Sequence, residues 1–348
     1  MGYFKKLQKI DKALRKAGES HLPADTQVRI FSNKLGIDYT YVSATPQPFH
    51  AASIGKVFVA ALLLQLASAG RLELDQSISE ILPPDMLAGL FTVDGKDYSA
   101  EVTIRQLATH TSGINDYFDS KSSQRSSFIE QVISQPDQFW KPDELLDYTR
   151  KYQKAVARPG EKFLYSDTGY VLLGKILEQV SGKTYDTLLY DSVFKPLDMK
   201  STYLYGYPIG LNPSGMAPLF VNGVDVSKMI SLTCDWSGGG IVTTLDDLLQ
   251  FQKALVDGKF GDLSSEQAGF QHTFQRGIHY GFGLMELHFN EFFFLLRGMP
   301  KMKGHIGITA THMFYDETND IHYVMNFGSD RRMVESFRAL IKIAQTLG

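Results

Sequence analysis

The stretch SIGKVFVAALLLQL, residues 53–66, is the part of this sequence that most constrains the fold. Nearly every residue after its lysine is apolar, so a helix formed here has no polar face to expose to water. A helix that is apolar on all sides is buried in the core of a large protein or spans a membrane. The unbroken apolar run, from Val57 to Leu64, is far shorter than the roughly 20 residues of a membrane span. We therefore predict a core helix that ends near Ala69-Gly70, because glycine commonly follows the last residue of a helix.

Ser53 and Lys56 lie at the start of this helix, three residues apart and therefore on one face. At that spacing the lysine amine can reach the serine hydroxyl, and serine becomes a nucleophile when a base takes its proton. We expect the apolar surroundings to favour a neutral amine that accepts this proton, and the helix N-terminus to favour the negative charge that develops. The opposing interpretation is a buried helix that begins with Ser and Lys by chance, since a pattern with two fixed positions recurs in a long chain. The motif alone does not decide between them.

Two further stretches carry polar residues next to tight turns. In the first, Tyr165 to Asp167 precede a predicted helix, where Asp167 is well suited to cap the helix and Tyr165 could be simple core packing. In the second, residues 303–311, two glycines lie where a strand begins, one of them Gly307. Glycine inside a strand marks a bulge or the close approach of a ligand. His305, between these glycines, could be a solvated edge residue.

Composition excludes several classes of protein. The chain of 348 residues has 43% apolar and 21% charged residues, an ordinary globular balance that fits one large domain or two moderate ones. Its formal net charge of -3 gives no reason to expect a nucleic acid or an anionic membrane as partner. A single cysteine, Cys234, leaves no intramolecular disulfide and no cysteine metal cluster. None of the histidines shows the H-E-x-x-H spacing of a zinc protease, and we expect neither a metal nor a cofactor.

The first residues predict an amphipathic helix, with Phe4, Leu7, Ile10 and Leu14 spaced by three and four. Charges run through this segment, and it lacks the continuous apolar region of a secretory signal. We therefore expect a cytoplasmic protein without an integral membrane segment. The sequence leaves its oligomeric state open.

Segments rich in aromatic and β-branched residues lie at both ends of the chain, and helical patterns lie between them. The predicted strands are 26–33 and 37–43 near the start, and 278–289, 291–298, 305–316 and 320–328 near the end, with a hairpin loop at 317–320. The predicted helices of the middle are 104–109, 126–134, 142–152, 169–181, 185–194 and 245–256, and a last helix covers 333–347. The polar, serine-rich segment 116–127 is typical of a surface loop.

These patterns predict an α+β fold. An antiparallel β-sheet, built from both ends of the chain, is flanked by the N- and C-terminal helices, and a mostly helical lobe lies beside it. We assign residues 1–70 and 276–348 to the sheet lobe and 71–275 to the helical lobe. We expect the site in the cleft between the lobes, where ligand sites are common.

In this order the three polar stretches resemble the serine β-lactamase-like family, which includes class C β-lactamases, D-alanyl-D-alanine carboxypeptidases, and related esterases and D-aminopeptidases. The resemblance rests on S-x-x-K at Ser53–Lys56, on a Tyr-x-Asn/Asp element at Tyr165–Asp167, and on a Lys/His-x-Gly element at His305–Gly307. Three more stretches are similar to the family: VTIRQLATHTSGI at 102–114, SGGGIVTTLDDLLQF at 237–251 and YGFGLMEL at 280–287. The resemblance covers essentially the whole chain after the first helix.

The resemblance implies a serine hydrolase that works through an acyl-enzyme. Ser53 would attack a carbonyl, while Lys56 and Tyr165 share its proton, with Tyr165 as general base and then general acid. A tyrosine of ordinary pKa, about 10, acts as a base near neutral pH only if positive charge lowers that value or the proton is passed in concert. The backbone N–H groups of Ser53 and Ile308 would form the oxyanion hole, with Gly307 beside them.

Two residues depart from the family's β-lactamases, which carry Asn and Lys where this chain has Asp167 and His305. We expect both to face the substrate together with Gly307 and Ile308. Both make the site less attractive to an anionic β-lactam, because Asp167 is negative and histidine is only partly charged near neutral pH. His110 is tempting as the histidine of a Ser-His-Asp triad, but the resemblance needs no such histidine, and we expect it to hold a turn.

We therefore expect a small-molecule or short-peptide substrate, either an ester or an amide of a D-configured residue. One alternative is a β-lactamase or penicillin-binding protein. The other is a catalytically silent relative that binds a peptide or a metabolite.

Overall fold

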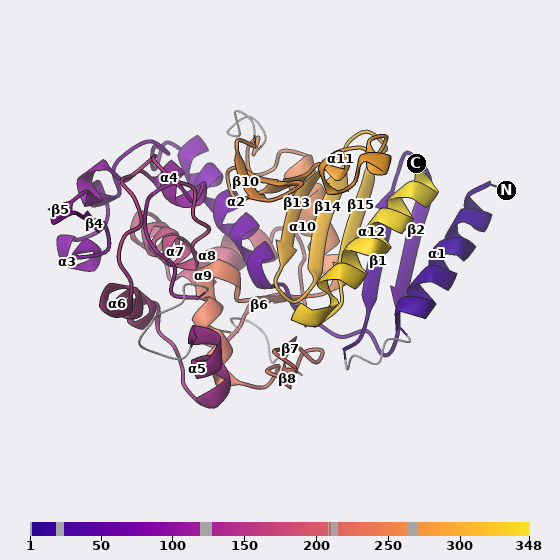
Figure 1. The fold of residues 1–348 in the computed structure, drawn as a ribbon, viewed down its shortest axis with the longest axis horizontal. Helices are drawn as coiled ribbons and strands as arrows, with labels where there is room; N and C mark the ends of the chain where they lie inside the picture. Colours follow the sequence, from indigo (N-terminus) through magenta and orange to yellow (C-terminus); the bar gives the residue numbers. More distant parts are fainter. Residues whose placement is uncertain (1, 19–23, 119–126, 208, 210–214, 264–269) are drawn as a thin grey trace.

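An eight-stranded antiparallel sheet forms one half of the protein (Figure 1). The computed structural model describes residues 2–18, 24–118, 127–207, 209, 215–263 and 270–348. Both ends of the chain contribute to the sheet, whose strand order is β10-β11-β12-β13-β14-β15-β1-β2. The strands are β1 (Gln27–Ser32), β2 (Ile37–Val42), β10 (His272–Gln275), β11 (Ile278–Tyr280), β12 (Met285–Leu287), β13 (Met302–Gly307), β14 (Thr311–Asp316) and β15 (Ile321–Asn326).

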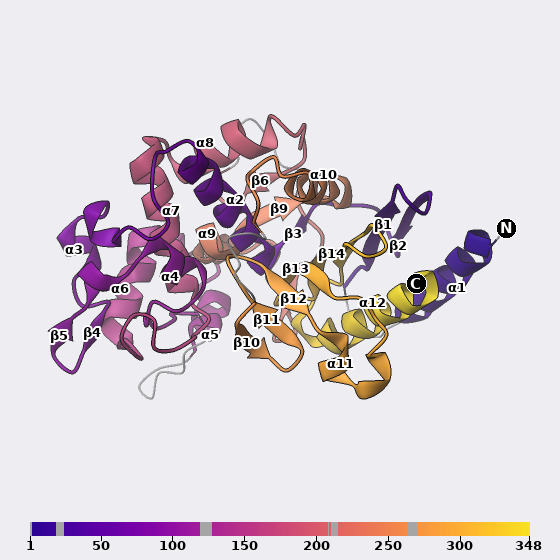
Figure 2. The same cartoon turned by 90° about the horizontal axis from the view of Figure 1, so that it is seen from above.

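Helices cover both faces of this sheet (Figure 2). The helices α1 (Gly2–Gly18) and α12 (Met333–Leu347) pack against each other on one face, and α10 (Leu245–Val256) contacts β1 and β15 on the other. Alternate residues of a strand share a face. Val28 and Ile30 of β1 accordingly join Ile10 and Leu340 of the two terminal helices in one buried apolar cluster.

The central helix of the other half is α2 (Gly55–Ser68). All its residues from Gly55 to Leu64 are buried, and it packs on α7 (Asp167–Ser181) and α9 (Trp236–Gly239). The predicted core helix is thereby confirmed, and Gly70 after it has a φ of 65°. The other helices are α3 (Pro84–Leu87), α4 (Ile104–Ala108), α5 (Phe128–Ser134), α6 (Pro142–Tyr152), α8 (Tyr185–Leu189) and α11 (Phe289–Phe292).

Most predicted elements are present with small shifts at their ends, and the α+β class is confirmed. The predicted strand at 291–298 is wrong, because this segment forms part of α11 and a 3-10 turn at Phe294–Leu296. Its large apolar residues do not alternate between a buried and an exposed face; Phe293, Phe294 and Leu295 are all exposed. Two other predicted strands each contain two strands joined by a short connection. The segment 278–289 contains β11 and β12, and the segment 305–316 contains the end of β13 and all of β14.

The middle of the chain also contains strands that the sequence did not predict. Its β6 (Tyr203–Leu204) and β9 (Ile241–Thr243) form a small sheet with β3 (Phe49–His50). One hairpin pairs β4 (Thr92–Val93) with β5 (Lys96–Asp97), and a second pairs β7 (Phe220–Val221) with β8 (Val224–Asp225). The division into two lobes stays a prediction. Of the predicted surface loop 116–127, residues 119–126 lie outside the described part of the chain. Within the described residues, every helix is too short or too polar to cross a membrane.

Candidate active site

Ser53 lies in a 3-10 turn, Ala52–Ile54, that leads directly into α2. Ala52 has a φ of 49°, in the left-handed region that residues other than glycine rarely adopt. Nδ1 of His50 accepts a hydrogen bond from the Ala52 N–H over 3.1 Å, which helps to hold this conformation. The turn also packs tightly on α9, since a Cβ added at Gly239 would lie 2.9 Å from the carbonyl carbon of Ala52. Ser53 is thus fixed at the end of a rigid, buried helix.

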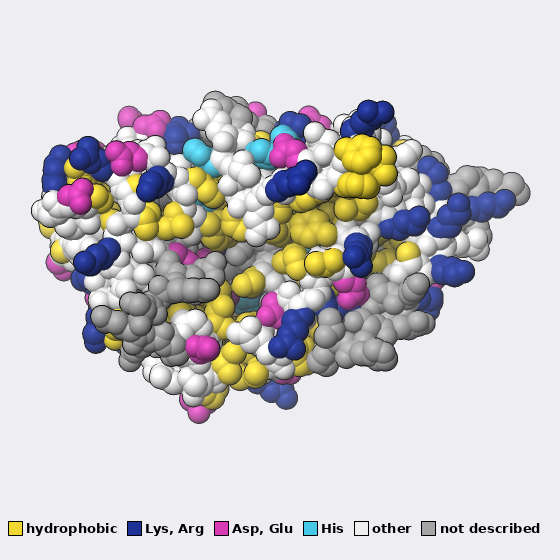
Figure 3. Space-filling model, viewed as in Figure 1, with side chains coloured by type: hydrophobic (Ala, Val, Ile, Leu, Met, Phe, Trp, Pro, Cys, Tyr) yellow, Lys and Arg dark blue, Asp and Glu magenta, His cyan; other side chains and the backbone are white. Residues whose placement is uncertain are grey.

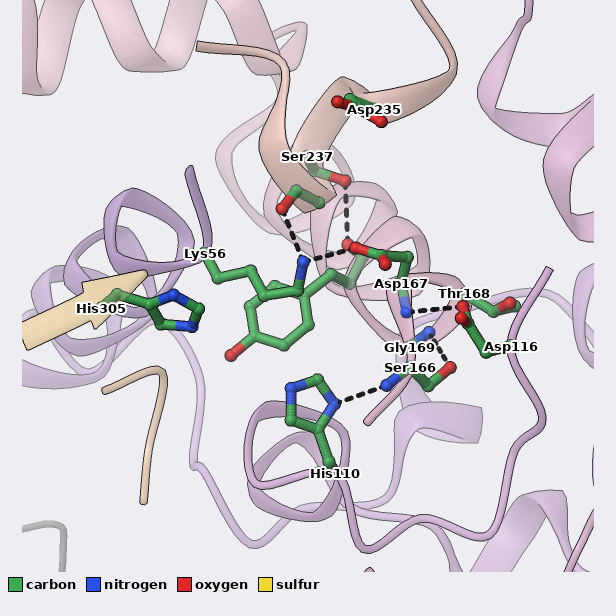
Figure 4. A network of polar contacts seen from close by, with 12 residues as sticks. Lys56, His110, Asp116, Ser166, Asp167, Thr168, Gly169, Asp235, Ser237 and His305 are labelled. Carbon is green, nitrogen blue, oxygen red and sulfur yellow. Dashed lines mark hydrogen bonds and ion pairs between the residues drawn. The ribbon is translucent and has the colours of Figure 1, made fainter. Parts of the chain in front are cut away.

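Lys56 is fully buried one turn after the serine. Its amine donates hydrogen bonds to the Asp167 carboxylate and, over 2.7 Å, to the carbonyl oxygen of Gly238 (Figure 4). Burial by itself lowers the pKa of Lys56, but the charge of Asp167 and the interactions with Tyr165 outweigh burial and raise this pKa above its ordinary value. The expectation of a neutral lysine is therefore wrong, because the fold supplies a carboxylate as its partner.

Asp167 is the first residue of α7, and the residue that caps this helix is Ser166. The Ser166 hydroxyl accepts a hydrogen bond from a backbone N–H of the first turn over 3.2 Å. The prediction that Asp167 is the cap is thus wrong; its carboxylate pairs with Lys56 instead. The Asp167 N–H donates to Oδ1 of Asp116 over 2.8 Å. A Cβ at Gly238 would lie 2.7 Å from Oδ1 of Asp167, so glycine there allows the carboxylate to come this close.

Tyr165 lies between Lys56 and His110. The lysine nitrogen is 4.9 Å from the centroid of the tyrosine ring, and the His110 ring is 4.3 Å from it, centroid to centroid. Among the described residues the buried Tyr165 hydroxyl makes no hydrogen bond of ordinary geometry, but it lies close enough to Ser53 and Lys56 for both to lower its pKa. Burial raises the pKa of Tyr165 to about 12, although the positive charge of Lys56 opposes this rise. Both proton carriers next to Ser53 are therefore protonated at neutral pH.

His110 holds the backbone on both sides of Tyr165, and Figure 4 shows its hydrogen bond to Ser166. Its carbonyl oxygen accepts from the Leu164 N–H over 2.9 Å, and its Nδ1 accepts from the Ser166 N–H over 3.0 Å. His110 is buried and has a φ of 59°. Through these two hydrogen bonds His110 positions the backbone next to Tyr165.

The third predicted element brings Gly307 and Ile308 to the same cavity as Ser53. Gly307 is the last residue of β13 and approaches the turn that carries the serine. A Cβ added to it would lie 2.8 Å from the Ala51 carbonyl oxygen and 2.8 Å from the Cβ of Ala52. Glycine at this position therefore sets the distance between the sheet and the serine.

His305 does not reach the cavity. It is fully buried, and its Nδ1 donates to the Ile306 carbonyl oxygen over 2.8 Å. Burial, helped by the charge of Lys56, lowers the pKa of His305 to about 3. The expectation that a partly charged His305 faces the substrate is contradicted, because its imidazole lies in the core and is neutral.

A cavity of about 390 Å³ lies beside Ser53. Three carboxylates line it, those of Asp116, Asp167 and Asp235, and the described lining includes no Lys or Arg side chain. Burial, together with the charge of Asp167, raises the pKa of Asp235 to about 7. Much of the remaining lining is apolar, including Phe118, Leu164, Phe274, Met285, Met333 and Phe337. Hydrophobic side chains extend across the middle of the face of the protein shown in Figure 3.

Two of these carboxylates, Asp116 and Asp235, were missed by sequence reasoning. Asp235 directly precedes Trp236 and the glycine-rich stretch that resembles the family, but the motif itself gives it no role. Asp116 follows the stretch 102–114 and has no motif of its own. Both are recognisable only once the cavity is seen.

The fold, with a serine, a buried lysine and a tyrosine at one cavity, defines a serine hydrolase of the β-lactamase type. Residues 45–347 match the family model described as Beta-lactamase, and the chain belongs to this family. The resemblance inferred from the three motifs is therefore confirmed.

Curated relatives include penicillin-binding proteins. The chain is 27% identical over 257 residues to penicillin-binding protein 4* of Bacillus subtilis (strain 168), covering 68% of this chain and 51% of that protein. It is 26% identical over 289 residues to the putative penicillin-binding protein PbpX of the same organism, covering 80% of this chain and 64% of that protein. The chain thus spans about a third to two thirds of the length of the curated relatives it matches.

Solved structures with the same fold include two amide hydrolases. One is a D-stereospecific amidohydrolase from Streptomyces sp., with a TM-score of 0.75, 23% identity and coverage of 94% of this chain and 97% of that chain. The other is the D-amino acid amidase from Ochrobactrum anthropi SV3 complexed with D-phenylalanine, with a TM-score of 0.76, 22% identity and 98% coverage of both chains. At these identities the likeness shows the fold.

Proposed function

We propose that this chain hydrolyses an ester, or an amide of a D-configured amino acid, through an acyl-enzyme formed on Ser53. One observation carries the proposal: the serine shares a cavity with Tyr165 and with the Asp167 carboxylate that binds the buried Lys56. The two amide hydrolases that share the fold support the same class of substrate.

In the first half of the reaction, the Ser53 oxygen bonds to the substrate carbonyl carbon, and the bond from that carbon to the amine or alcohol breaks. The raised pKa values of Lys56 and Tyr165 keep both protonated, so neither is a free base before the substrate binds. This favours a concerted transfer in which Tyr165 accepts the serine proton while its own proton moves to the leaving group. Water then attacks the acyl-enzyme by the same route in reverse. The backbone N–H groups of Ser53 and Ile308 serve as oxyanion donors.

The carboxylates that line the cavity support a substrate whose acyl part carries a protonated amine. Asp116 and Asp235 line the cavity, and the charge of Lys56 is already matched by Asp167. The carboxylate of a β-lactam would enter against this negative charge, whereas an ammonium group is attracted to it. A cation beside Asp235 also favours its ionised form, which burial otherwise disfavours.

Turnover of a small substrate panel by wild type and Ser53→Ala, measured side by side, tests the proposal. The panel holds D-phenylalanine p-nitroanilide, its L isomer, its N-acetyl derivative, p-nitrophenyl butyrate and nitrocefin. We expect the D-amino anilide or the ester to be hydrolysed, and Ser53→Ala to lose activity by about 10⁴-fold or more. N-acetylation, which removes the positive charge, is expected to lower kcat/KM about tenfold.

Covalent labelling adds an independent readout. A fluorophosphonate probe should label the folded wild type at Ser53, as located by peptide mapping. Turnover that survives Ser53→Ala, or a folded wild type that takes no label, would refute the acyl-enzyme. Faster turnover of nitrocefin than of any amine substrate would refute the proposed substrate class and favour a β-lactamase.

A further inference from the structure

Among the described residues, one group of histidine and carboxylate side chains has the spacing of a metal site: His279, His288 and Glu291. One potential ligand atom of each lies within 4.8 Å of the other two. His279 belongs to β11, His288 directly precedes α11, and Glu291 lies within α11. None of the three lines the catalytic cavity. Figure 3 shows histidine and acidic side chains next to each other at the surface between β10 and α11.

Both imidazole rings point at the same carboxylate. Nε2 of His279 lies 3.0 Å from each oxygen of Glu291, and Nδ1 of His288 lies 3.0 Å from Oε1 of Glu291. The centroids of the two rings are 4.2 Å apart. The histidine side chains are each 17% exposed and the glutamate side chain is 35% exposed, so an ion can enter from solvent.

A second carboxylate fixes the orientation of His288. Its Nε2 lies 2.5 Å from Oε1 of Glu286, and Lys301 donates to the same oxygen over 3.0 Å. A neutral His288 that donates its Nε2 proton to Glu286 presents the lone pair of Nδ1 to Glu291. A lone pair and a carboxylate oxygen 3.0 Å apart repel each other unless a positive species lies between them. That species is either a second proton on His288 or a bound cation.

We propose that His279 Nε2, His288 Nδ1 and Glu291 bind a divalent transition metal ion, with Zn²⁺ as the best fit. Zinc binds imidazole nitrogen and carboxylate oxygen at about 2.0–2.2 Å, which places tetrahedral ligand atoms about 3.3 Å apart. The two histidine–glutamate separations of 3.0 Å need to open by only a few tenths of an ångström, and the two histidine nitrogens lie within 4.8 Å of each other. The fourth position is left for water. Glu286 then acts as the carboxylate that commonly orients a zinc-bound histidine through its other nitrogen.

The ion would connect α11 to β11, the strand that pairs with β10, and β10 forms part of the wall of the catalytic cavity. Thr273 of β10 pairs with His279, and the two residues after Thr273, Phe274 and Gln275, line the cavity. The metal would restrain this wall without touching Ser53. We therefore assign it a structural role, visible in thermal stability.

Zinc titration by calorimetry, with tag-free protein that has been freed of metal by EDTA and dialysis, tests the site. Wild type should bind one Zn²⁺ per chain at pH 7.5 with a Kd below about 10 µM, and zinc should raise its thermal unfolding midpoint. His288→Gln and Glu291→Gln should each weaken binding at least 100-fold, and Glu286→Gln about tenfold or more. His272→Gln is the matched control, because it removes a histidine of β10 outside the cluster and should keep the wild-type affinity.

Cobalt provides a readout that does not depend on variants. Co²⁺ added to the wild type should give visible absorption bands that zinc abolishes, which keeps the test decisive if a glutamine variant fails to fold. No zinc uptake at about 100 µM would overturn the proposal, as would Glu291→Gln binding zinc as tightly as wild type. The positive species between His288 and Glu291 would then be the second proton.

Discussion

Replacing Asp235 by asparagine tests the charge of the cavity wall most directly. The Asp235 side chain is 18% exposed, and burial together with Asp167 raises its pKa from 3.8 to about 7. Between about pH 4 and pH 7 the folded protein therefore keeps a proton on Asp235 that the unfolded chain releases. The stability of the wild type falls as pH rises through this window, because the unfolded state binds fewer protons. Asparagine removes the titration and keeps the shape of the side chain.

The size of the effect follows from the two pKa values. With 3.8 in the unfolded chain and about 7 in the folded protein, ionisation of Asp235 opposes folding by about 2 kcal/mol at pH 5 and about 4 kcal/mol at pH 9. The free energy of unfolding of Asp235→Asn, relative to wild type, should therefore rise by about 2 to 3 kcal/mol between these pH values. Effects that do not depend on pH, such as a change in packing, cancel in this comparison.

Urea unfolding followed by tryptophan fluorescence at pH 5, 7 and 9 measures this difference. For a chain of this size, a difference of about 2 to 3 kcal/mol corresponds to about 3 to 4 °C in the thermal midpoint, which gives a second readout. Asp137→Asn is the control, because Asp137 is exposed and its substitution should leave the two pH profiles parallel. Parallel profiles for wild type and Asp235→Asn would refute the reasoning, since Asp235 would then already be ionised in the folded protein at pH 5.

Two further substitutions separate the proton carriers from the oxyanion hole. Asp167→Asn removes the charge that keeps Lys56 protonated, so burial then lowers the pKa of Lys56. The kcat/KM of this variant, measured from pH 5 to 10, should therefore show a titration that wild type lacks. Loss of the ion pair should also lower the free energy of unfolding by about 3 kcal/mol at pH 7. Gly307→Ala puts a Cβ 2.8 Å from the Ala51 carbonyl oxygen and should push β13 away from the serine, which should lower kcat about 100-fold. Gly298→Ala is the control, because a Cβ there meets nothing within 4 Å and kcat should stay unchanged. An unchanged pH profile in the first case, or equal kcat for the two alanine variants in the second, would contradict these expectations.

The residues that sequence reasoning found are those whose spacing is local. Ser53 and Lys56 are three positions apart in a helix, and Tyr165 and Asp167 lie within one short turn, so each pair is close whatever the rest of the chain does. Asp116 comes to the site through tertiary packing, because its carboxylate accepts from a backbone N–H 51 positions further along. No local pattern could reveal that contact.

The fold was predictable for a similar reason. The strongly periodic segments, above all the apolar helix after Ser53, appear where the sequence places them. The segment 291–298 was not predictable from its composition, because an aromatic run that stays exposed has the same residues as one that enters a sheet. Which of the two occurs depends on whether the neighbouring strand edges are already paired.

The two buried basic side chains, Lys56 and His305, have different charge states, and their partners explain the difference. Lys56 and His305 are both fully buried, and burial disfavours the charged form of each. Lys56 has the Asp167 carboxylate within hydrogen-bonding distance and stays charged, whereas His305 bonds a backbone carbonyl and has the charge of Lys56 nearby, so it is neutral. The buried Lys56 is therefore already paired with Asp167, whereas Asp235 has no Lys or Arg partner among the described residues that line the cavity. We therefore expect this cavity to favour a substrate that carries a positive charge, an expectation that residue type alone could not have provided.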